Sequence, residues 1–172
     1  AVAGFGLEAH VIICGYGRAG RRIGEFLAGE GIPFLALDVD PHQIKVAHPV
    51  EGRVAFGNAD RIEVMQAAGL SRARAVAIAY PDVHSAERVL RLVRSQRSDI
   101  PVIVRTPDDT DMAKLKAAGA TEVIPEVLEG SLMIAAETLA QLGIPVERAM
   151  TRVREVRAER YASLRDFYRK PR

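Results

Sequence analysis

The sequence from His10 to Asp40 reads HVIICGYGRAGRRIGEFLAGEGIPFLALDVD, and this stretch decides the fold. Val11 to Cys14 is a short apolar run of the kind that forms a buried parallel strand. Three glycines in the spacing G-x-G-x-x-G then lead into an amphipathic helical pattern. A second apolar run, Phe34 to Leu37, ends at an acid, Asp38. Strand, glycines, helix, strand and acid in this order predict a nucleotide-binding site.

Each glycine of the loop has its own expected role. Gly15 permits the tight turn out of the strand, Gly17 lets the backbone approach a phosphate, and Gly20 lets the helix pack closely on the sheet. The free N–H groups at the helix start then face the anion. Arg18 lies inside the loop, where phosphate is a natural partner for a cation. The alternative is that the glycines serve helix packing only and that Arg18 is a solvated surface residue.

The acid that ends the second strand predicts what the ligand carries. Asp38 stands eighteen residues after Gly20, where a carboxylate can accept hydrogen bonds from a ribose diol. This favours a ribose without a 2′-phosphate. The alternative is that Asp38 and Asp40 merely start a turn before Pro41.

The rest of the chain repeats strand and helix. Six strands with helices between them predict an α/β fold, a Rossmann-like doubly wound parallel sheet in the order 3-2-1-4-5-6 with a C-terminal helical extension. After Asp38 we expect strands at 53–56, 75–80, 101–105 and 122–124, and helices at 41–47, 61–68, 83–97, 108–118, 127–142 and from 146 to about 168.

Residues that directly follow the strands are candidates for ligand contact, since ligands of such sheets bind at the carboxyl ends of the strands. Asn58 can bond an adenine edge, whereas Asp60 more naturally caps the next helix. Tyr80 can cover a ribose or base, although a turn capped by Asp82 needs no ligand. Arg105 can reach a phosphate or pair with a nearby aspartate. The expected cofactor contacts are Gly15, Tyr16, Gly17, Arg18, Ala19, Gly20, Asp38, Val39, Asp40, Asn58, Ala59, Asp60, Ala79, Tyr80 and Arg105.

Composition and length are those of a globular domain. The chain has 172 residues, 48% hydrophobic and 27% charged, with a single cysteine and therefore no internal disulfide. It shows no signal peptide and no apolar run near 18 residues, which predicts a cytoplasmic piece. Because it begins at Ala1 and opens with the irregular AVAGFGL, we expect residues 1–8 to be a linker or tag remnant.

Motifs for catalysis are lacking. The chain has no Tyr-x-x-x-Lys pair, no Cys/His metal spacing and no serine-centred elbow. Its four histidines are scattered, and each is expected to be a surface residue or a hydrogen-bonded core residue. We therefore expect no catalytic residue, no metal site and no enzymatic activity.

Five motifs together resemble the RCK/KTN (TrkA-N) domain attached to Kef-type potassium/proton antiporters. They are HVIICGYGRAGRRIGEFL, ALDVDP, GNAD, VIVRTPDD and LKAAGATEVIPEVLEGSLMIA, and the resemblance covers about His10 to Gly143. The arginine inside the glycine motif and the late A-G-A-x-x-V-I-x-E pattern are more specific than the dinucleotide fingerprint alone.

The resemblance implies a regulator that does not catalyse. Domains of this family lie on the cytoplasmic side of the membrane, form homodimers through the sheet edge and crossing late helices, and bind AMP, ATP or NAD(H) to bias the transport domain. Gly15 to Gly20 match the phosphate loop, Asp38 the ribose acid, and Asn58 with Ala59 the adenine turn. Asn58 and Asp60 depart from the family's usual aspartate and hydroxyl residue, so adenine contacts are expected to differ in detail.

Regulation by glutathione is doubtful. Members of the family that glutathione gates carry basic residues on the first helix and before the late helix. At the positions we align, this chain has Glu25 and Pro125, and an acid there repels the carboxylates of the tripeptide.

The expected organisation is a linker (1–8), an RCK/KTN nucleotide-binding domain (9–143) and a basic C-terminal helix (144–172). Residues 128–142 are apolar on too many sides for a surface helix, which predicts a homodimer interface. We expect the cytoplasmic domain of an inner-membrane potassium/proton antiporter, joined to a transmembrane domain of the same chain and binding no nucleic acid. The alternatives are a soluble or channel-linked RCK-type interaction module, or an NAD-dependent oxidoreductase.

Overall fold

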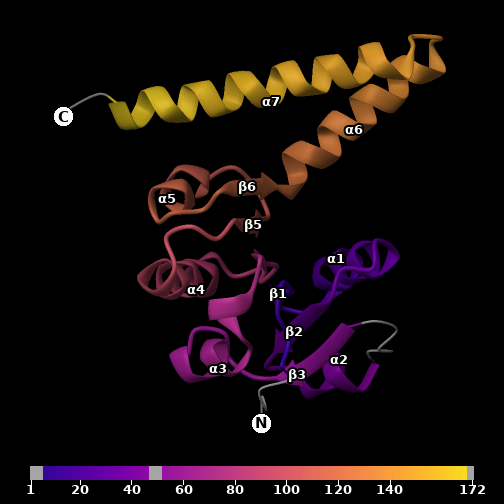
Figure 1. Cartoon of the computed structure of the whole chain (residues 1–172). Helices are drawn as coiled ribbons and strands as arrows, with labels where there is room; N and C mark the ends of the chain where they lie inside the picture. Colours follow the sequence, from indigo (N-terminus) through magenta and orange to yellow (C-terminus); the bar gives the residue numbers. More distant parts are fainter. Residues whose placement is uncertain (1–5, 47–51, 170–172) are drawn as a thin grey trace. The chain divides into compact units, whose positions relative to one another are not determined.

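The computed structural model describes residues 6–46 and 52–169, so that most of the expected linker at 1–8 lies outside the described residues. Strands and helices alternate along the described chain (Figure 1). In chain order the elements are β1 (Val11–Cys14), α1 (Arg18–Gly29), β2 (Phe34–Asp38), α2 (Pro41–Val46), β3 (Gly52–Phe56), α3 (Ile62–Ala67), the 3₁₀ helix η1 (Leu70–Arg72), β4 (Ala75–Ile78), α4 (Val83–Gln96), β5 (Val102–Thr106), α5 (Met112–Ala117), β6 (Glu122–Pro125), α6 (Glu126–Gln141) and α7 (Val146–Arg169).

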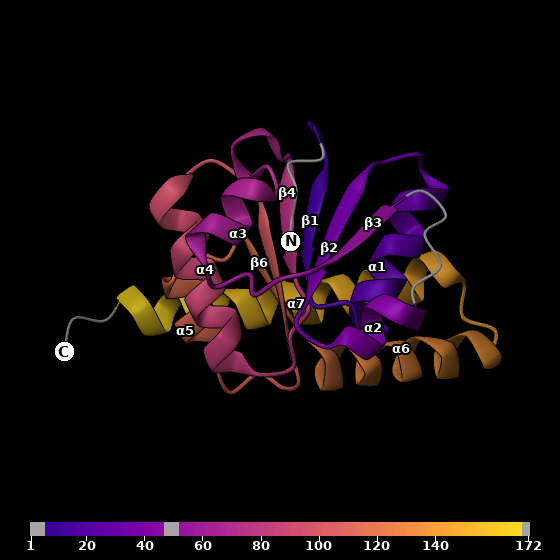
Figure 2. The ribbon, with the colours of Figure 1, turned by 90° about the horizontal axis from the view of Figure 1, so that it is seen from below.

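The six strands form one sheet in the order β3-β2-β1-β4-β5-β6, which confirms the predicted doubly wound topology. The central strand β1 runs parallel to both neighbours, with Val11 beside Phe34 of β2 and Ala75 of β4. All residues of β1 and β2 are buried, as their unbroken apolar runs predicted. Helices α1 and α2 lie on one face of the sheet, and α3, α4 and α5 lie on the other (Figures 1 and 2).

Close packing of α1 on the sheet depends on small residues. Gly24 is buried in α1, and a Cβ there would lie 2.9 Å from Phe34 Cζ and 3.1 Å from Tyr16 Oη. The two aromatic rings lie side by side, with centroids 6.3 Å apart, in a cluster that also contains Val11 and Ile13. The side chain of Tyr16 therefore belongs to the core between α1 and β2.

Apart from the start of α5, the helices after β2 begin and end within about one residue of their predicted bounds. Gly69 and Gly119 end α3 and α5 in left-handed backbone, with φ of +78° and +111°. The predicted start of α5 at residue 108 is wrong, because α5 begins at Met112. Asp108 Oδ1 instead accepts the Thr110 N–H at 3.0 Å, and the Thr106 hydroxyl donates to the Asp108 carbonyl at 2.6 Å. These local bonds hold the segment before α5 in a turn.

The chain divides into two compact units, residues 1–124 and 125–172. In the second unit α6 and α7 form a helical hairpin, whose turn contains Gly143 at a φ of +84°. Ala149 and Val153 of α7 are buried, and Arg157 pairs with Glu129 of α6 through both carboxylate oxygens. By its contacts α6 thus groups with α7. The domain limits expected from the sequence, 1–8, 9–143 and 144–172, stay a prediction. No helix in the described ranges is both long and apolar enough to cross a bilayer.

Candidate functional site

The glycine loop turns sharply out of β1. Gly15 has a φ of +98°, and a Cβ there would lie 3.0 Å from Tyr80 Cδ1. Its N–H donates to the Leu37 carbonyl at 2.8 Å, which continues the ladder to β2. The left-handed backbone and the Tyr80 ring together exclude a side chain at this position.

The other two glycines of the motif differ in what surrounds them. A Cβ on Gly20 would lie 1.9 Å from the Gly15 carbonyl oxygen, so the loop packs directly on the first turn of α1. Gly17 has ordinary backbone, with a φ of −76°, and a Cβ there would meet nothing within 4 Å. The protein's own packing therefore explains Gly15 and Gly20 but leaves open space at Gly17.

The start of α1 presents unbonded donors beside that space. The Arg21 N–H bonds the Gly17 carbonyl at 2.9 Å, and the amides before it, from Arg18 to Gly20, have no acceptor within the helix. Gly17 caps the helix without a side-chain hydrogen bond. Arg18 is exposed and, among the described residues, makes no hydrogen bond or ion pair, whereas Arg21 bonds the Tyr16 carbonyl and Gln43. The helix start and Arg18 are thus suited to an anion.

Asp38 ties the loop to the end of β2. Its carboxylate accepts the Tyr16 N–H at 2.7 Å and the Asp40 N–H at 2.8 Å, and the residue is only 8% exposed. Asp40 in turn accepts the His42 N–H at 2.9 Å and starts α2. Asp40 therefore acts as a turn former, which is the alternative that the sequence left open for both acids. Asp38 is a buried acid at the loop, and each of its oxygens keeps a further lone pair for a ribose hydroxyl.

The turn after β3 is linked to α4 by an ion pair between Asp60 and Arg88. Asn58 Oδ1 accepts the Asp60 N–H at 3.1 Å, and Asp60 Oδ2 accepts from Arg88 Nε of α4, also at 3.1 Å. The predicted cap of α3 by Asp60 is wrong, because Arg61 occupies the cap position and no side chain bonds there. Ala59, between the two, is fully buried.

Tyr80 covers the loop from the end of β4. Burial raises the pKa of its hydroxyl, and the Asp38 and Asp60 carboxylates act in the same direction. The buried hydroxyl faces the Ala59 N–H, but no group in the described part of the chain meets hydrogen-bond geometry with it. Arg105 Nη1 donates to the Ala79 carbonyl at 3.3 Å from the neighbouring strand.

A cavity of about 170 Å³ lies where β2, β3 and β4 end. It brings together four of the predicted contacts, while the loop glycines, Asp38 and Arg105 do not line it. The lining residues are Val39, Asn58, Asp60, Tyr80, Pro81, Asp82, Ser85, Arg88 and Val89.

Helix α4 also lines this cavity, with residues that the sequence pattern did not single out. Asp82 caps α4 by accepting the His84 and Ser85 N–H groups at 3.2 and 3.3 Å, and the Ser85 hydroxyl donates to the same carboxylate. Ser85, Arg88 and Val89 follow at helical spacing on the face that lines the cavity. The spacing from a predicted cap is the signal that would have identified them.

Other reactive side chains are occupied or buried. Burial raises the pKa of the Cys14 thiol to about 12. His10 is buried, and its Nε2 donates to the Ala68 carbonyl at 2.8 Å, while burial lowers its pKa. No group of three or more His, Cys, Asp or Glu side chains in the described ranges is arranged to hold a metal ion.

Known proteins are similar to this chain over most of its length. The TrkA-N domain family matches residues 11–126. A protein of Alkalimonas amylolytica named as a K(+) efflux antiporter, KefB, is 38% identical over 164 residues, which are 95% of this chain and 25% of that protein. The glutathione-regulated potassium-efflux system protein KefC of Cronobacter sakazakii is 29% identical over 80% of this chain and 22% of that protein.

Among solved structures, the Kef CTD of Shewanella denitrificans in its AMP-bound form has a TM-score of 0.76 and is 25% identical. The match covers 91% of this chain and 96% of that one. The chain spans about a quarter of the length of the two curated relatives.

Proposed function

The chain belongs to the TrkA-N domain family, and from this premise we propose that it is the nucleotide-binding regulatory domain of a potassium/proton antiporter. The main support for a nucleotide site is the open space at Gly17 beside the unbonded amides of α1. A phosphate in that space gains backbone hydrogen bonds and the favourable end of the helix dipole. Arg18, which has no partner within the described residues, adds a mobile cation at the same place.

The ligand we propose is an adenine nucleotide, AMP, ATP or NAD(H). The AMP-bound Shewanella structure, which aligns over most of this chain, supports this choice. The phosphate binds at Gly17 and α1, Asp38 accepts from the ribose, and the base lies toward the cavity lined by Asn58 and Tyr80. The Tyr80 hydroxyl is buried without a hydrogen-bond partner in the described part of the chain, so it is free to bond such a ligand.

The partners we propose follow from the antiporter relatives, which are longer than this chain. The domain acts on the cytoplasmic side of an inner membrane, joined to a transport domain of the same protein, and forms a homodimer. The exposed side chains of α6 support an interface, because Ile134 is 70% exposed and Val127 is 66% exposed. Glutathione is left out of the proposal, since the exposed Glu25 of α1 presents a carboxylate, bonded to Arg22, at the aligned position.

NADP is expected to bind at least tenfold more weakly than NAD. Its 2′-phosphate would meet the buried carboxylate of Asp38, where like charges a few ångströms apart cost on the order of 1–4 kcal/mol. Calorimetric titration of the domain with AMP, ATP, NAD, NADH and NADP measures the order of affinities. NADP as the tightest ligand contradicts the ribose assignment, and binding of none of the five contradicts the proposed function.

A matched pair of variants isolates the carboxylate. Asp38→Asn removes the charge that opposes the 2′-phosphate, so the ratio of NAD to NADP affinity falls toward one. Asp40→Asn changes an exposed acid that caps α2 and leaves this ratio nearly unchanged. The ratio is the informative quantity, because Asp38→Asn also weakens the bonds to Tyr16 and Asp40 and lowers both affinities.

The bound nucleotide is expected to stay intact. A regulatory ligand shifts a conformational equilibrium by its differential affinity, and couplings of about 1–3 kcal/mol change transport several-fold. The domain is incubated with ATP or NADH, and the products are separated by chromatography. Steady turnover that is lost in Gly17→Val identifies an enzyme and favours the alternative of an NAD-dependent oxidoreductase.

A further inference from the structure

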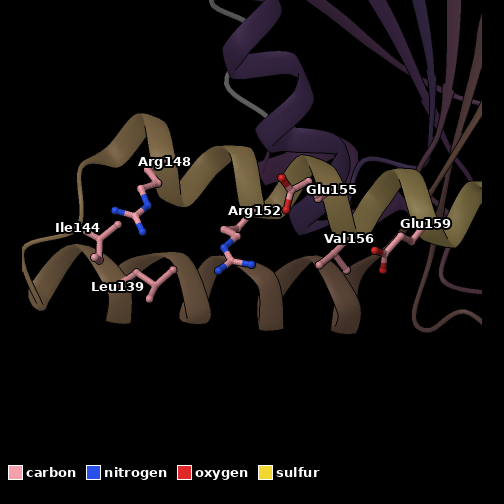
Figure 3. A pocket seen from close by; sticks show the side chains of 7 residues that line it. All are labelled: Leu139, Ile144, Arg148, Arg152, Glu155, Val156 and Glu159. Carbon is pink, nitrogen blue, oxygen red and sulfur yellow. The ribbon is translucent and has the colours of Figure 1, made fainter.

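A groove of about 500 Å³ runs between α6 and α7 in the second compact unit (Figure 3). Two arginines line the part near the hairpin turn, and two glutamates follow farther along α7 (Figure 3). Three apolar side chains complete the groove. The lining residues are Leu139, Ile144, Arg148, Arg152, Glu155, Val156 and Glu159.

The four charged residues form one stripe along α7, here named the charge stripe. Arg148, Arg152, Glu155 and Glu159 are spaced by four, three and four residues, which places them on one face of a helix. All four are exposed, and none of their side chains makes a hydrogen bond or ion pair within the described residues. Arg157 differs, because it turns to α6 and binds Glu129. The charge stripe is therefore an unpaired surface beside an open groove.

Two of the three neighbouring pairs in the stripe are unfavourable within a single helix, whereas Arg152 and Glu155, three residues apart, carry opposite charges. Arg148 and Arg152 are one turn apart, and so are Glu155 and Glu159, and like charges at this spacing destabilise a helix by about 0.2–0.5 kcal/mol per pair. The order is nevertheless self-complementary. Arg148 and Glu159 are equally distant from the midpoint between residues 153 and 154, and so are Arg152 and Glu155.

We propose that α7 of a second copy of this chain lies antiparallel along the charge stripe, related by a two-fold axis that passes between residues 153 and 154. Arg148 then faces Glu159 of the partner subunit, and Arg152 faces Glu155 of the partner subunit. Two-fold symmetry repeats both contacts and gives four ion pairs. The partner helix also covers Val156, which is 39% exposed at the edge of the groove. The inference rests on the proposed homodimer and adds its register.

Charge balance favours a second copy over other occupants. The stripe carries two positive and two negative charges, so neither a nucleic acid nor an anionic lipid surface gains from the whole of it. A small anion at the arginines would leave the glutamates unpaired. An antiparallel copy of the same helix pairs all four charges at once.

Charge reversal tests the pairing. Arg148→Glu with Arg152→Glu makes the stripe wholly acidic, and Glu155→Arg with Glu159→Arg makes it wholly basic. Each double variant alone replaces four attractive contacts by repulsive ones, and the homodimer dissociation constant is expected to rise at least tenfold. An equimolar mixture of the two variants restores all four pairs, so heterodimers form with wild-type affinity. The chain carrying all four substitutions has the wild-type net charge and forms homodimers again.

The readout is fluorescence-detected sedimentation from nanomolar to tens of micromolar concentration, with circular dichroism to verify folding. Wild-type dimers whose affinity no charge variant changes overturn the pairing but leave the proposed homodimer intact. A wild-type monomer throughout overturns both. Failure of the fourfold variant to recover also overturns the pairing and indicates an occupant other than a second copy.

Cross-linking reports the register independently. A mixture of Arg148→Cys and Glu159→Cys chains is expected to cross-link with a short bifunctional maleimide. Arg148→Cys chains alone are not expected to cross-link, because the two cysteines at position 148 lie about 16 Å apart along the helix axis. The native Cys14 is buried with a raised pKa and does not compete. Cross-linking of Arg148→Cys with itself at high yield overturns the antiparallel register.

Discussion

Gly20→Ala is expected to destabilise the domain by about 3 kcal/mol, which lowers Tm by roughly 6–12 °C. A Cβ at this position would lie 1.9 Å from the Gly15 carbonyl oxygen and 2.9 Å from its carbon. These are backbone atoms, which cannot swing aside as a side chain can, so α1 must move away from the sheet. That movement also displaces the amides proposed to bind the phosphate. Differential scanning calorimetry and AMP titration measure the two effects.

Gly29→Ala is the matched control for this variant. Gly29 lies at the other end of the same helix, and a Cβ there meets nothing within 4 Å. Because alanine has a higher helix propensity than glycine, this variant is expected to be neutral or more stable by up to about 1 kcal/mol. A Gly20→Ala protein as stable as Gly29→Ala contradicts the close approach of loop and helix.

Gly17→Val is expected to leave Tm within about 2 °C of the wild-type value and to weaken AMP binding about a hundredfold. Gly17 has extended backbone that valine can adopt, and its Cβ would point into open space. A branched side chain there occupies the proposed position of the phosphate and removes one or two charge-assisted hydrogen bonds, each contributing about 1.5–3 kcal/mol. Calorimetric titration and thermal unfolding of the same sample separate binding from folding.

Gly29→Val provides the control, since it adds the same side chain to α1 at an equally open position far along the helix. It is expected to bind AMP with wild-type affinity. If Gly17→Val keeps that affinity too, the phosphate binds elsewhere, and the open space at Gly17 loses its functional meaning.

The centre of the sheet could be predicted because β1 and β2 are buried on both faces. Their uninterrupted apolar runs, VIIC and FLAL, show no helical periodicity, and the connections then determine the strand order. The roles of Gly15 and Gly20 were equally accessible, since left-handed backbone and helix packing are recurrent demands of this loop.

Local polar groups were harder to predict, because several acceptors compete for the same amides. Asp60 precedes α3 and has the chemistry of a cap, yet Arg88 from α4 engages it, and the sequence does not show that Arg88 is near. Asp108 likewise bonds Thr110 and delays α5 to Met112. Such choices depend on tertiary neighbours or on differences of about 1 kcal/mol between turns.

The cavity after β4 and the groove beside α7 needed the structure for another reason. Ser85 and Arg88 enter the cavity only because α4 begins at Asp82 with a particular rotation about its axis. For α7, the sequence showed a mixture of arginines and glutamates, which is typical of a solvated helix. The pairing of Arg157 with Glu129 shows which face turns to α6, and hence which charges remain outside.

Asp38 has a thermodynamic consequence for the site. Two short hydrogen bonds from the Tyr16 and Asp40 amides, both within the protein, fix the loop and the residues after β2. The conformational entropy of the loop is therefore lost during folding. Binding of the proposed nucleotide does not add the cost of ordering the loop a second time. If the domain regulates transport as proposed, a loop held in this way favours a signal carried by rigid movement of whole elements over one carried by ordering of the loop.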